Sequence, residues 1–206
     1  MANGNDRLVW IDCEMTGLDV GTDQLVEIAI VITDFDLTIL DPGLDIVIRP
    51  DQAALDNMSD FVREMHASSG LLKAIPDGVS LGEAQDAVLA YIRRFVPVPQ
   101  TAPLAGNTIG TDRAFLARYM PRVDTHLHYR NVDVSSIKEL VRRWLPRVYF
   151  NAPEKGGGHR ALADILESIR ELEYYRRTAI VVDPGPTTDE VQAAAASVVE
   201  DFAARL

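Results

Sequence analysis

The chain has 206 residues, 47% of them hydrophobic, which suits one sizeable domain with a substantial core. Asp and Glu number 31 against 20 Lys and Arg, and the net charge of −11 argues against tight wrapping of a long nucleic acid. Either nucleic acid is not the ligand or the ligand is short. The sequence contains no apolar run long enough for a bilayer and no signal-peptide pattern, so we expect a cytoplasmic protein without a membrane partner.

Three β-rich runs occupy the first fifty residues, at 8–17, 24–34 and 45–50, and predict a meander of consecutive strands. Helical periodicity follows at 59–72 and 81–95. Ser80 and Glu83 offer a capping box for the second of these helices, and Pro97 ends it.

Strands and helices alternate in the next part of the chain, which indicates a mixed sheet flanked by helices, an α/β fold. Ser136 and Glu139 offer a second capping box. The expected elements are a strand at 102–107, a helix that ends at Pro121, a strand at 131–134, a helix at 136–145 and a long helix from about 159 to 177.

The composition changes after residue 180. Residues 183–186 have the composition of a linker, and residues 188–206 form an Ala-rich, acidic pattern typical of an amphipathic helix. We therefore expect a domain over 1–180 and an acidic extension over 181–206 that is helical or partly mobile.

The first strand carries two carboxylates. Alternation of side chains places Trp10, Asp12 and Glu14 on one face and Val9, Ile11 and Cys13 on the other, which is the core face. Two carboxylates so spaced can share a hard cation, although a lone pair of this kind is more often a solvent-facing strand end. Cys13, the one cysteine, is expected to be a small core residue without a catalytic role.

Two more acids and a histidine have less ordinary positions. Asp112 lies in the first turn of its helix, where stabilisation of the helix dipole is an equally good explanation. Asp164 lies on the flank of an apolar stripe, five residues after His159. In one regular helix these two side chains would be about 140° apart, so His159 is expected on the Gly-rich loop or in the first turn.

The ordered set Asp12-x-Glu14, Asp112 and His159-x4-Asp164 resembles the DEDDh superfamily of 3′→5′ exonucleases. The surrounding residues at 10–18, 106–113 and 159–165 are similar to those of its oligoribonuclease branch, and the resemblance covers roughly residues 6–178. It implies an RNase H-like fold with a mixed five-stranded sheet and the hydrolysis of short oligoribonucleotides, especially dinucleotides, to nucleoside 5′-monophosphates.

The resemblance also implies two divalent cations, Mg²⁺ or Mn²⁺, held by four carboxylates. Asp12 would bridge both ions, Glu14 and Asp164 would complete one site, and Asp112 would support the other directly or through water. His159 would act as general base, a role that suits an imidazole titrating near neutral pH.

Substrate contacts are implied at further positions. Leu18 would wedge against a base, Phe61 would stack on the 3′ side, and His66 would contact the backbone of the substrate. The family usually has Trp at the position of Phe61, so Phe61 offers a smaller platform. From the sequence alone, core positions are the favoured explanation for Leu18 and Phe61, and the resemblance reverses that preference.

A cap on the 5′ phosphate is implied at Thr108, Arg130 and Ser135, where the family usually has Ser in place of Thr108. Such a cap would select short RNA. Tyr129 matches a residue that reaches into the neighbouring subunit's site, which implies a homodimer. A proofreading-type DNA exonuclease and an inactive RNase H-like binding module are the alternatives, and the complete acidic set with His159 argues against the inactive module.

Overall fold

The computed structural model describes residues 6–154, 156, 158–181 and 184–203. Its described residues form a five-stranded mixed sheet in the order β3-β2-β1-β4-β5. Strand β1 (Leu8–Met15) lies in the middle, antiparallel to β2 (Leu25–Thr33) and parallel to β4 (Pro103–Gly106). Strands β3 (Leu44–Val47) and β5 (His128–Asp133) form the edges. The predicted meander and the mixed five-stranded sheet are therefore confirmed.

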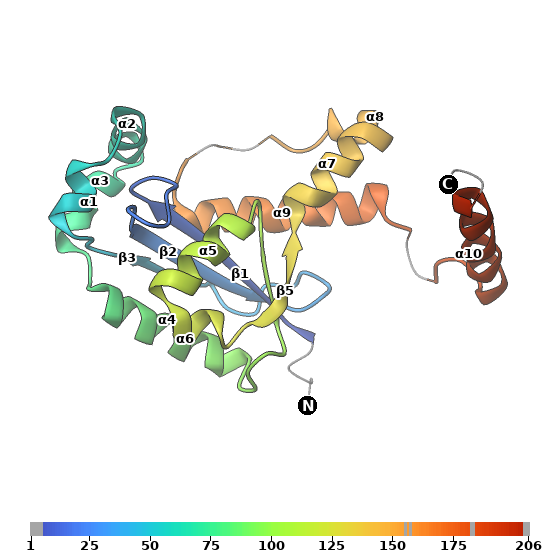
Figure 1. Cartoon of the computed structure of the whole chain (residues 1–206), viewed down its shortest axis with the longest axis horizontal. Coiled ribbons are helices and arrows are strands. Elements are labelled where there is room, and N and C mark those ends of the chain that lie inside the picture. Colours follow the sequence, from blue (N-terminus) through green and yellow to red (C-terminus); the bar gives the residue numbers. More distant parts are fainter. Residues whose placement is uncertain (1–5, 155, 157, 182–183, 204–206) are drawn as a thin grey trace.

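Helices surround this sheet on both faces (Figure 1). Those that cover the faces are α4, α5, α7 and α9, and shorter turns connect them. The described helices are α1 (Gln52–Asp56), α2 (Asp60–Ser68), α3 (Leu71–Ala74), α4 (Leu81–Phe95), α5 (Gly110–Tyr119), α6 (Pro121–Asp124), α7 (Val134–Trp144), α8 (Pro146–Tyr149), α9 (Ala161–Ala179) and α10 (Thr188–Ala203), with a 3₁₀ turn at Ile75–Asp77.

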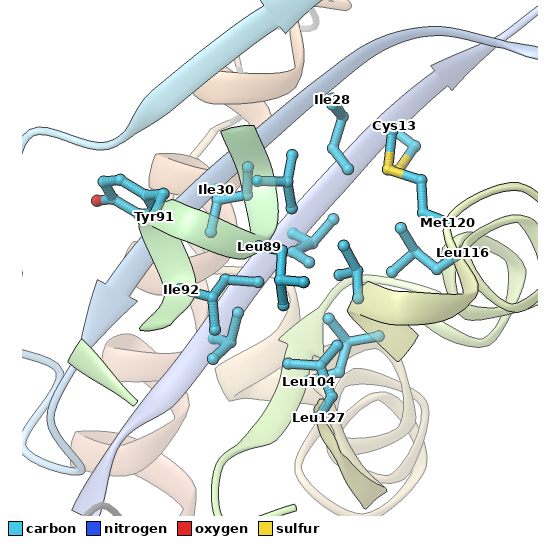
Figure 2. Packing of buried hydrophobic residues seen from close by; sticks show 14 of the residues in the cluster. Cys13, Ile28, Ile30, Leu89, Tyr91, Ile92, Leu104, Leu116, Met120 and Leu127 are labelled. Atoms are coloured by element: carbon cyan, nitrogen blue, oxygen red, sulfur yellow. The ribbon is translucent and has the colours of Figure 1, made fainter. Parts of the chain in front are cut away.

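The core has two layers, one on each side of the sheet. Val9, Ile11 and Cys13 of β1 pack with residues of α4 and α5, and Figure 2 shows part of this layer. Trp10 points to the other layer, beneath α9, and its indole N–H donates a 2.9 Å hydrogen bond to the Thr33 hydroxyl. The face that carries Asp12 and Glu14 is thus also a core face, so a helix covers the carboxylates from above.

Several helix boundaries follow the sequence pattern. The capping box of α4 is confirmed, because the Ser80 hydroxyl accepts from the Glu83 amide while the Glu83 carboxylate accepts from the Ser80 amide. The expected helix over 59–72 is wrong as one element. It breaks at Gly70, whose φ of +79° ends α2 and starts α3.

The predicted capping box of α7 is also wrong. Asp133 is the N-cap, and its carboxylate accepts hydrogen bonds from the Ser135 amide and the Ser136 hydroxyl. Glu139 instead pairs with Arg143 one turn later. The strand before this helix begins at His128, three residues earlier than expected.

The C-terminal helix α10 stands apart from the rest of the molecule (Figure 1). The expected helix is confirmed over Thr188–Ala203, and residues 204–206 lie outside the described part. Part of the expected linker, at 182–183, also lies outside it. Across the described residues, no helix combines the length and the apolar character needed to cross a membrane.

Candidate active site

Three elements bring the predicted acids together at one end of the sheet. Asp12 and Glu14 come from β1, Asp112 from the first turn of α5, and Asp164 from the first turn of α9. One ligand atom each from Glu14, Asp164 and His159 lies within 4.8 Å of the others. The structure thus assembles a compact donor set from residues 150 positions apart in the chain.

A hydrogen bond to Asp112 connects helix α5 to the central strand β1. The Cys13 amide donates a 3.0 Å hydrogen bond to Oδ1 of Asp112, which is buried. The helix-dipole explanation for Asp112 therefore accounts for only part of its environment. Cys13 itself is buried, and burial raises the pKa of its thiol, in agreement with a core role.

The carboxylates oppose one another's ionisation. Burial, followed by the charges of Asp112, Glu14 and Asp164, raises the pKa of Asp12 to about 9. Burial and neighbouring carboxylates raise the pKa of Glu14 to about 7, against an opposing contribution from Arg160. Burial raises the pKa of Asp112 to about 7, although its hydrogen bonds lower it. Such a cluster favours any cation that can neutralise it.

The donor set fits hard divalent cations. Carboxylate oxygens are the ligands that Mg²⁺ and Mn²⁺ prefer. Here ligand atoms of Glu14, Asp164 and His159 lie within 4.8 Å of one another, and the charges of Asp112, Glu14 and Asp164 act on Asp12. Because the carboxylates repel one another when ionised, bound cations would stabilise the ionised state. Asp12, Glu14, Asp112 and Asp164 are the residues that would hold them.

His159 lies just before α9, which begins at Ala161. Its backbone has a φ of +46°, in the left-handed region that residues other than glycine seldom adopt. The side chain is exposed, and it approaches Glu14 and Asp164 from outside the helix. The expectation that His159 and Asp164 do not share one helix face is confirmed.

Leu18 and Phe61 are exposed by 77% each, so neither is a core residue. Leu18 follows Gly17 in a tight loop that the Asp23 carboxylate holds together, because Asp23 accepts hydrogen bonds from the Thr16 hydroxyl and the Asp19 amide. A Cβ at Gly17 would lie 2.4 Å from the Asp23 carboxylate. The loop that presents Leu18 therefore needs glycine at that position.

His66 is fully buried, in contrast to the exposed position that a substrate contact requires. Its Nε2 hydrogen-bonds the Met15 carbonyl at 2.8 Å, and its Nδ1 lies 3.9 Å from the Glu14 carboxylate. The buried ring holds α2 against the end of β1. The contact of His66 with substrate stays a prediction.

The residues expected to cap a 5′ phosphate meet at the N-terminus of α7. The hydroxyls of Thr108 and Ser135 lie 3.1 Å apart, and the Thr108 amide donates to Ser135 Oγ and to the Asp133 carboxylate. Thr108 has a φ of +52°, an unusual value for a β-branched residue. Arg130 and Tyr129 are exposed nearby in β5, with the guanidinium carbon of Arg130 5.4 Å from the centre of the Tyr129 ring.

A partly buried polar network joins this cap to α9. The Ser135 hydroxyl donates to Oδ1 of Asn107, and Nδ2 of Asn107 donates to Ser168 Oγ and to the Glu171 carboxylate. Ser168 donates in turn to the Asp164 carbonyl. Sequence reasoning missed these residues, although a Glu within the apolar stripe of a helix was a usable signal.

Glu27 and Arg160 were also missed. Glu27 is the residue of β2 directly opposite Glu14, and Arg160 follows His159. Their side chains form an ion pair in which Nη2 of Arg160 lies 2.7 Å from Oε1 of Glu27. An acid in the middle of an otherwise apolar strand run was the signal that could have found Glu27.

Comparison with known proteins places these motifs in a family. Residues 9–172 match the RNase_T exonuclease family. The oligoribonuclease of Leifsonia xyli is 73% identical over the full length of both chains. The chain belongs to the oligoribonuclease family. The family member from Rhodococcus jostii is 61% identical over 96% of this chain and 98% of its own length, and that of Streptomyces coelicolor 58% over 95% and 98%.

The fold of this oligoribonuclease-family chain also resembles solved exonuclease structures. Exonuclease I from Methylocaldum szegediense aligns with a TM-score of 0.64 at 17% identity, over 84% of this chain. E. coli exonuclease I in complex with a dT13 oligonucleotide aligns with a TM-score of 0.63 at 12% identity, over 83% of it. This chain spans 41% of the length of each. These likenesses confirm the RNase H-like exonuclease fold.

Proposed function

We propose that this protein is a 3′→5′ exoribonuclease that hydrolyses short oligoribonucleotides, with dinucleotides as preferred substrates, to nucleoside 5′-monophosphates. The observation that carries the proposal is the convergence of Glu14, Asp164 and His159 within 4.8 Å, in a chain whose family members carry the name oligoribonuclease.

Two divalent cations are proposed as cofactors, with Mg²⁺ or Mn²⁺ as the physiological ions. The raised pKa values of Asp12, Glu14 and Asp112 support this, because several buried carboxylates in one cluster require positive charge to ionise together. When bound, such ions supply activation of a water molecule and stabilisation of the departing 3′ oxygen.

The protein's own side chains would hold the cations and deprotonate the attacking water. Asp12, Glu14, Asp112 and Asp164 hold the cations, and His159 accepts the proton of the attacking water at an imidazole nitrogen. His159 suits this role because it reaches the carboxylates from the solvent side, where a proton taken up can be passed to water.

The proposed substrate contacts form two groups. Leu18 and Phe61 expose apolar surface for stacking of bases, a mode of binding that does not require a basic protein. Thr108, Ser135 and Arg130 would receive the 5′ phosphate through two hydroxyls and a guanidinium. When the 5′ phosphate occupies this cap, the RNA cannot extend further at its 5′ end, so short RNA is preferred.

A homodimer is proposed on the side of β5. This edge strand presents exposed Tyr129 and Arg130. Helix α7 exposes Trp144, and Phe150 is exposed directly after α8. An exposed strand edge beside large apolar side chains is a typical place for another chain to pack. Size-exclusion chromatography with light scattering tests the assembly, and Trp144→Ala should weaken it.

The domain division is a further proposal. Residues 1–180 would form the exonuclease domain and 181–206 an extension that does not take part in catalysis. The exposure of residues 188–201 supports this, because a helix exposed all round adds little to the core. Truncation after residue 180 should leave dinucleotide hydrolysis unchanged. The cytoplasmic location stays a prediction that cell fractionation would test.

A direct test of the activity compares a 5′-phosphorylated RNA dinucleotide with a longer RNA and with a DNA dinucleotide. We expect hydrolysis of the RNA dinucleotide in Mg²⁺ or Mn²⁺, loss of it with a chelator, and slower cleavage of the other two. Chelator-resistant binding without hydrolysis would favour the inactive module, and equal turnover of DNA would favour the proofreading-type exonuclease.

A further inference from the structure

Glu27 is a buried acid in a position that ordinary packing does not explain. All nine residues of β2 are buried, and the exposure of Glu27 is 0%. Burial of an ionised carboxylate is costly unless the group is paired and hydrogen-bonded. The contacts of Glu27 therefore indicate what the fold gains from it.

Both carboxylate oxygens of Glu27 are engaged at the start of α9. Oε1 accepts a hydrogen bond from Nε of Arg160 at 2.8 Å, and Nη2 of Arg160 forms an ion pair with the same oxygen at 2.7 Å. Oε2 accepts the amide N–H of Ala161, the first residue of the helix, at 3.0 Å. Glu27, a residue of β2, thus caps the N-terminus of α9. Arg160, the N-cap residue of this helix, makes no side-chain cap hydrogen bond itself.

These contacts separate Glu27 from the metal-holding acids. Its two oxygens are directed at the arginine and the helix amide, and Glu27 is absent from the described ligand atoms that converge on Glu14. Arg160 also lies 3.5 Å from Asp45 on β3, so one guanidinium offsets two further acids beside the cluster. Arg160 is largely occupied by protein carboxylates.

The contacts of Glu27 with Arg160 and with the Ala161 amide, which we call the clamp, act directly on the residue after His159. A residue other than glycine with a φ of +46° has a strained backbone, and this conformation persists only where the surroundings fix it. On its C-terminal side, His159 is followed by Arg160 and Ala161, and Glu27 binds both. Asp164 lies in the same first turn of α9.

We propose that Glu27, through Arg160 and the Ala161 amide, is the positioning residue that holds His159 over the acidic cluster. It touches neither substrate nor cation. The inference rests on the proposed function, because His159 is the proposed general base. A misplacement of about 1 Å at such a group reduces turnover by roughly 10²-fold while substrate binding is kept.

The experiment uses the full-length variants Glu27→Gln, Arg160→Lys and their double mutant. Glu173→Gln is the matched control, because Glu173 lies on the same helix and pairs with Arg176 and Arg177 far from the cluster. Kinetics use a 5′-phosphorylated RNA dinucleotide in Mg²⁺. Calorimetry of the metal-free proteins counts the Mn²⁺ ions bound, and NMR measures hydrogen exchange of the Ala161 amide without metal or substrate.

We expect Glu27→Gln to lower kcat by roughly 10–100-fold, with KM within about threefold and the wild-type number of Mn²⁺ ions. Arg160→Lys should lower kcat by less, because Lys keeps the charge but loses the paired geometry. The double mutant should resemble Glu27→Gln, since both changes alter the same contact between Glu27 and Arg160. Exchange at Ala161 should be faster in Glu27→Gln than in the wild type, and unchanged in Glu173→Gln.

Four results would overturn the proposal. They are an unchanged kcat in folded Glu27→Gln, the loss of one Mn²⁺ per chain, an effect confined to KM, and unchanged exchange at Ala161. Should Glu27→Gln fail to fold, Arg160→Lys decides alone, since a wild-type kcat in that variant contradicts the clamp. If the wild type does not hydrolyse the dinucleotide, the proposed function fails, whereas the exchange at Ala161 still tests the clamp.

Discussion

Asp12 and Glu14 occupy positions where burial and like charge oppose ionisation, and burial opposes the ionisation of Asp112. A fold selected for stability alone would place apolar or paired groups there. Ionisation of the three carboxyls therefore destabilises the metal-free protein. Bound cations would offset this destabilisation, which is why the cluster has affinity for them.

Replacing Asp12 tests this balance at one residue. Asp12→Asn should abolish hydrolysis, by on the order of 10³-fold or more, because the central ligand for the cations is lost. The same change should raise the Tm of the metal-free protein at pH 8, since it removes one of the repelling groups. Single-turnover kinetics and thermal unfolding check both effects. Asp36→Asn, at an exposed acid paired with Arg176, should change neither.

Phe61 offers a second test at the scale of one side chain. Phe61→Ala should raise KM for a dinucleotide about tenfold with little change in kcat, because stacking contributes about 1–3 kcal/mol per base. Phe61→Trp should lower KM, since the indole is a larger platform. Steady-state kinetics measure both. A fall in kcat alone would place Phe61 in the chemical step and contradict a stacking role.

The sequence predicted the acids of the site because their order and spacing form a recognisable pattern. Glu27 was invisible to that reasoning, because its role depends on a strand and a helix start that lie 133 residues apart in the chain. His66 was identified as a substrate contact by resemblance, and that role stays a prediction. Its burial beside Glu14 could not be predicted, because it depends on how α2 packs against β1.

At the scale of elements, long amphipathic helices and the central strands followed their periodicity, as α4 and β2 show. The four-residue helices α3, α6 and α8 did not, because such short turns have no periodic signal. The cap of α7 failed for a related reason. Asp133, Ser135 and Ser136 all suit an N-cap, and the sheet register decides among them.

The loop between β1 and β2 provides an element-scale prediction. Gly17→Ala would force the new methyl group against the Asp23 carboxylate and open the loop. We expect KM for dinucleotides to rise severalfold as Leu18 shifts, with a loss of about 1–3 kcal/mol in the free energy of unfolding. Gly82→Ala is the control, because no atom lies within 4 Å of its new methyl group and alanine favours the helix. Denaturant titration and kinetics compare the two.

For the whole molecule, the raised pKa values set the pH dependence of stability. In the unfolded chain the carboxyls of Asp12, Glu14 and Asp112 ionise near pH 4, whereas in the fold their pKa values are about 9, 7 and 7. Between these limits the native state binds more protons than the unfolded state. The free energy of unfolding therefore falls as the pH rises from about 4 through 7 and on to 9.

The size of this effect can be measured by thermal unfolding without metal. One retained proton over two pH units corresponds to about 2.7 kcal/mol, or a Tm lower by roughly 5–10 °C. We expect the metal-free Tm to fall between pH 5 and pH 9, and Mg²⁺ to raise it more at pH 8 than at pH 5. A metal-free Tm that rises over this range would contradict the repulsion described for the cluster.

Helix α9 connects the acidic cluster to the proposed phosphate cap. Its first turn holds Asp164, and Ser168 one turn later and Glu171 two turns later accept hydrogen bonds from Asn107 beside the proposed phosphate cap. Seven residues of helix span about 10 Å, a distance that hydrogen bonds along the helix keep nearly constant. In the proposed function, the helix would keep a constant distance between the scissile phosphodiester bond and the 5′ phosphate in the cap. A change in the length of the preferred RNA would then require a helix of different length. Substitutions of the exposed side chains around the site would not suffice.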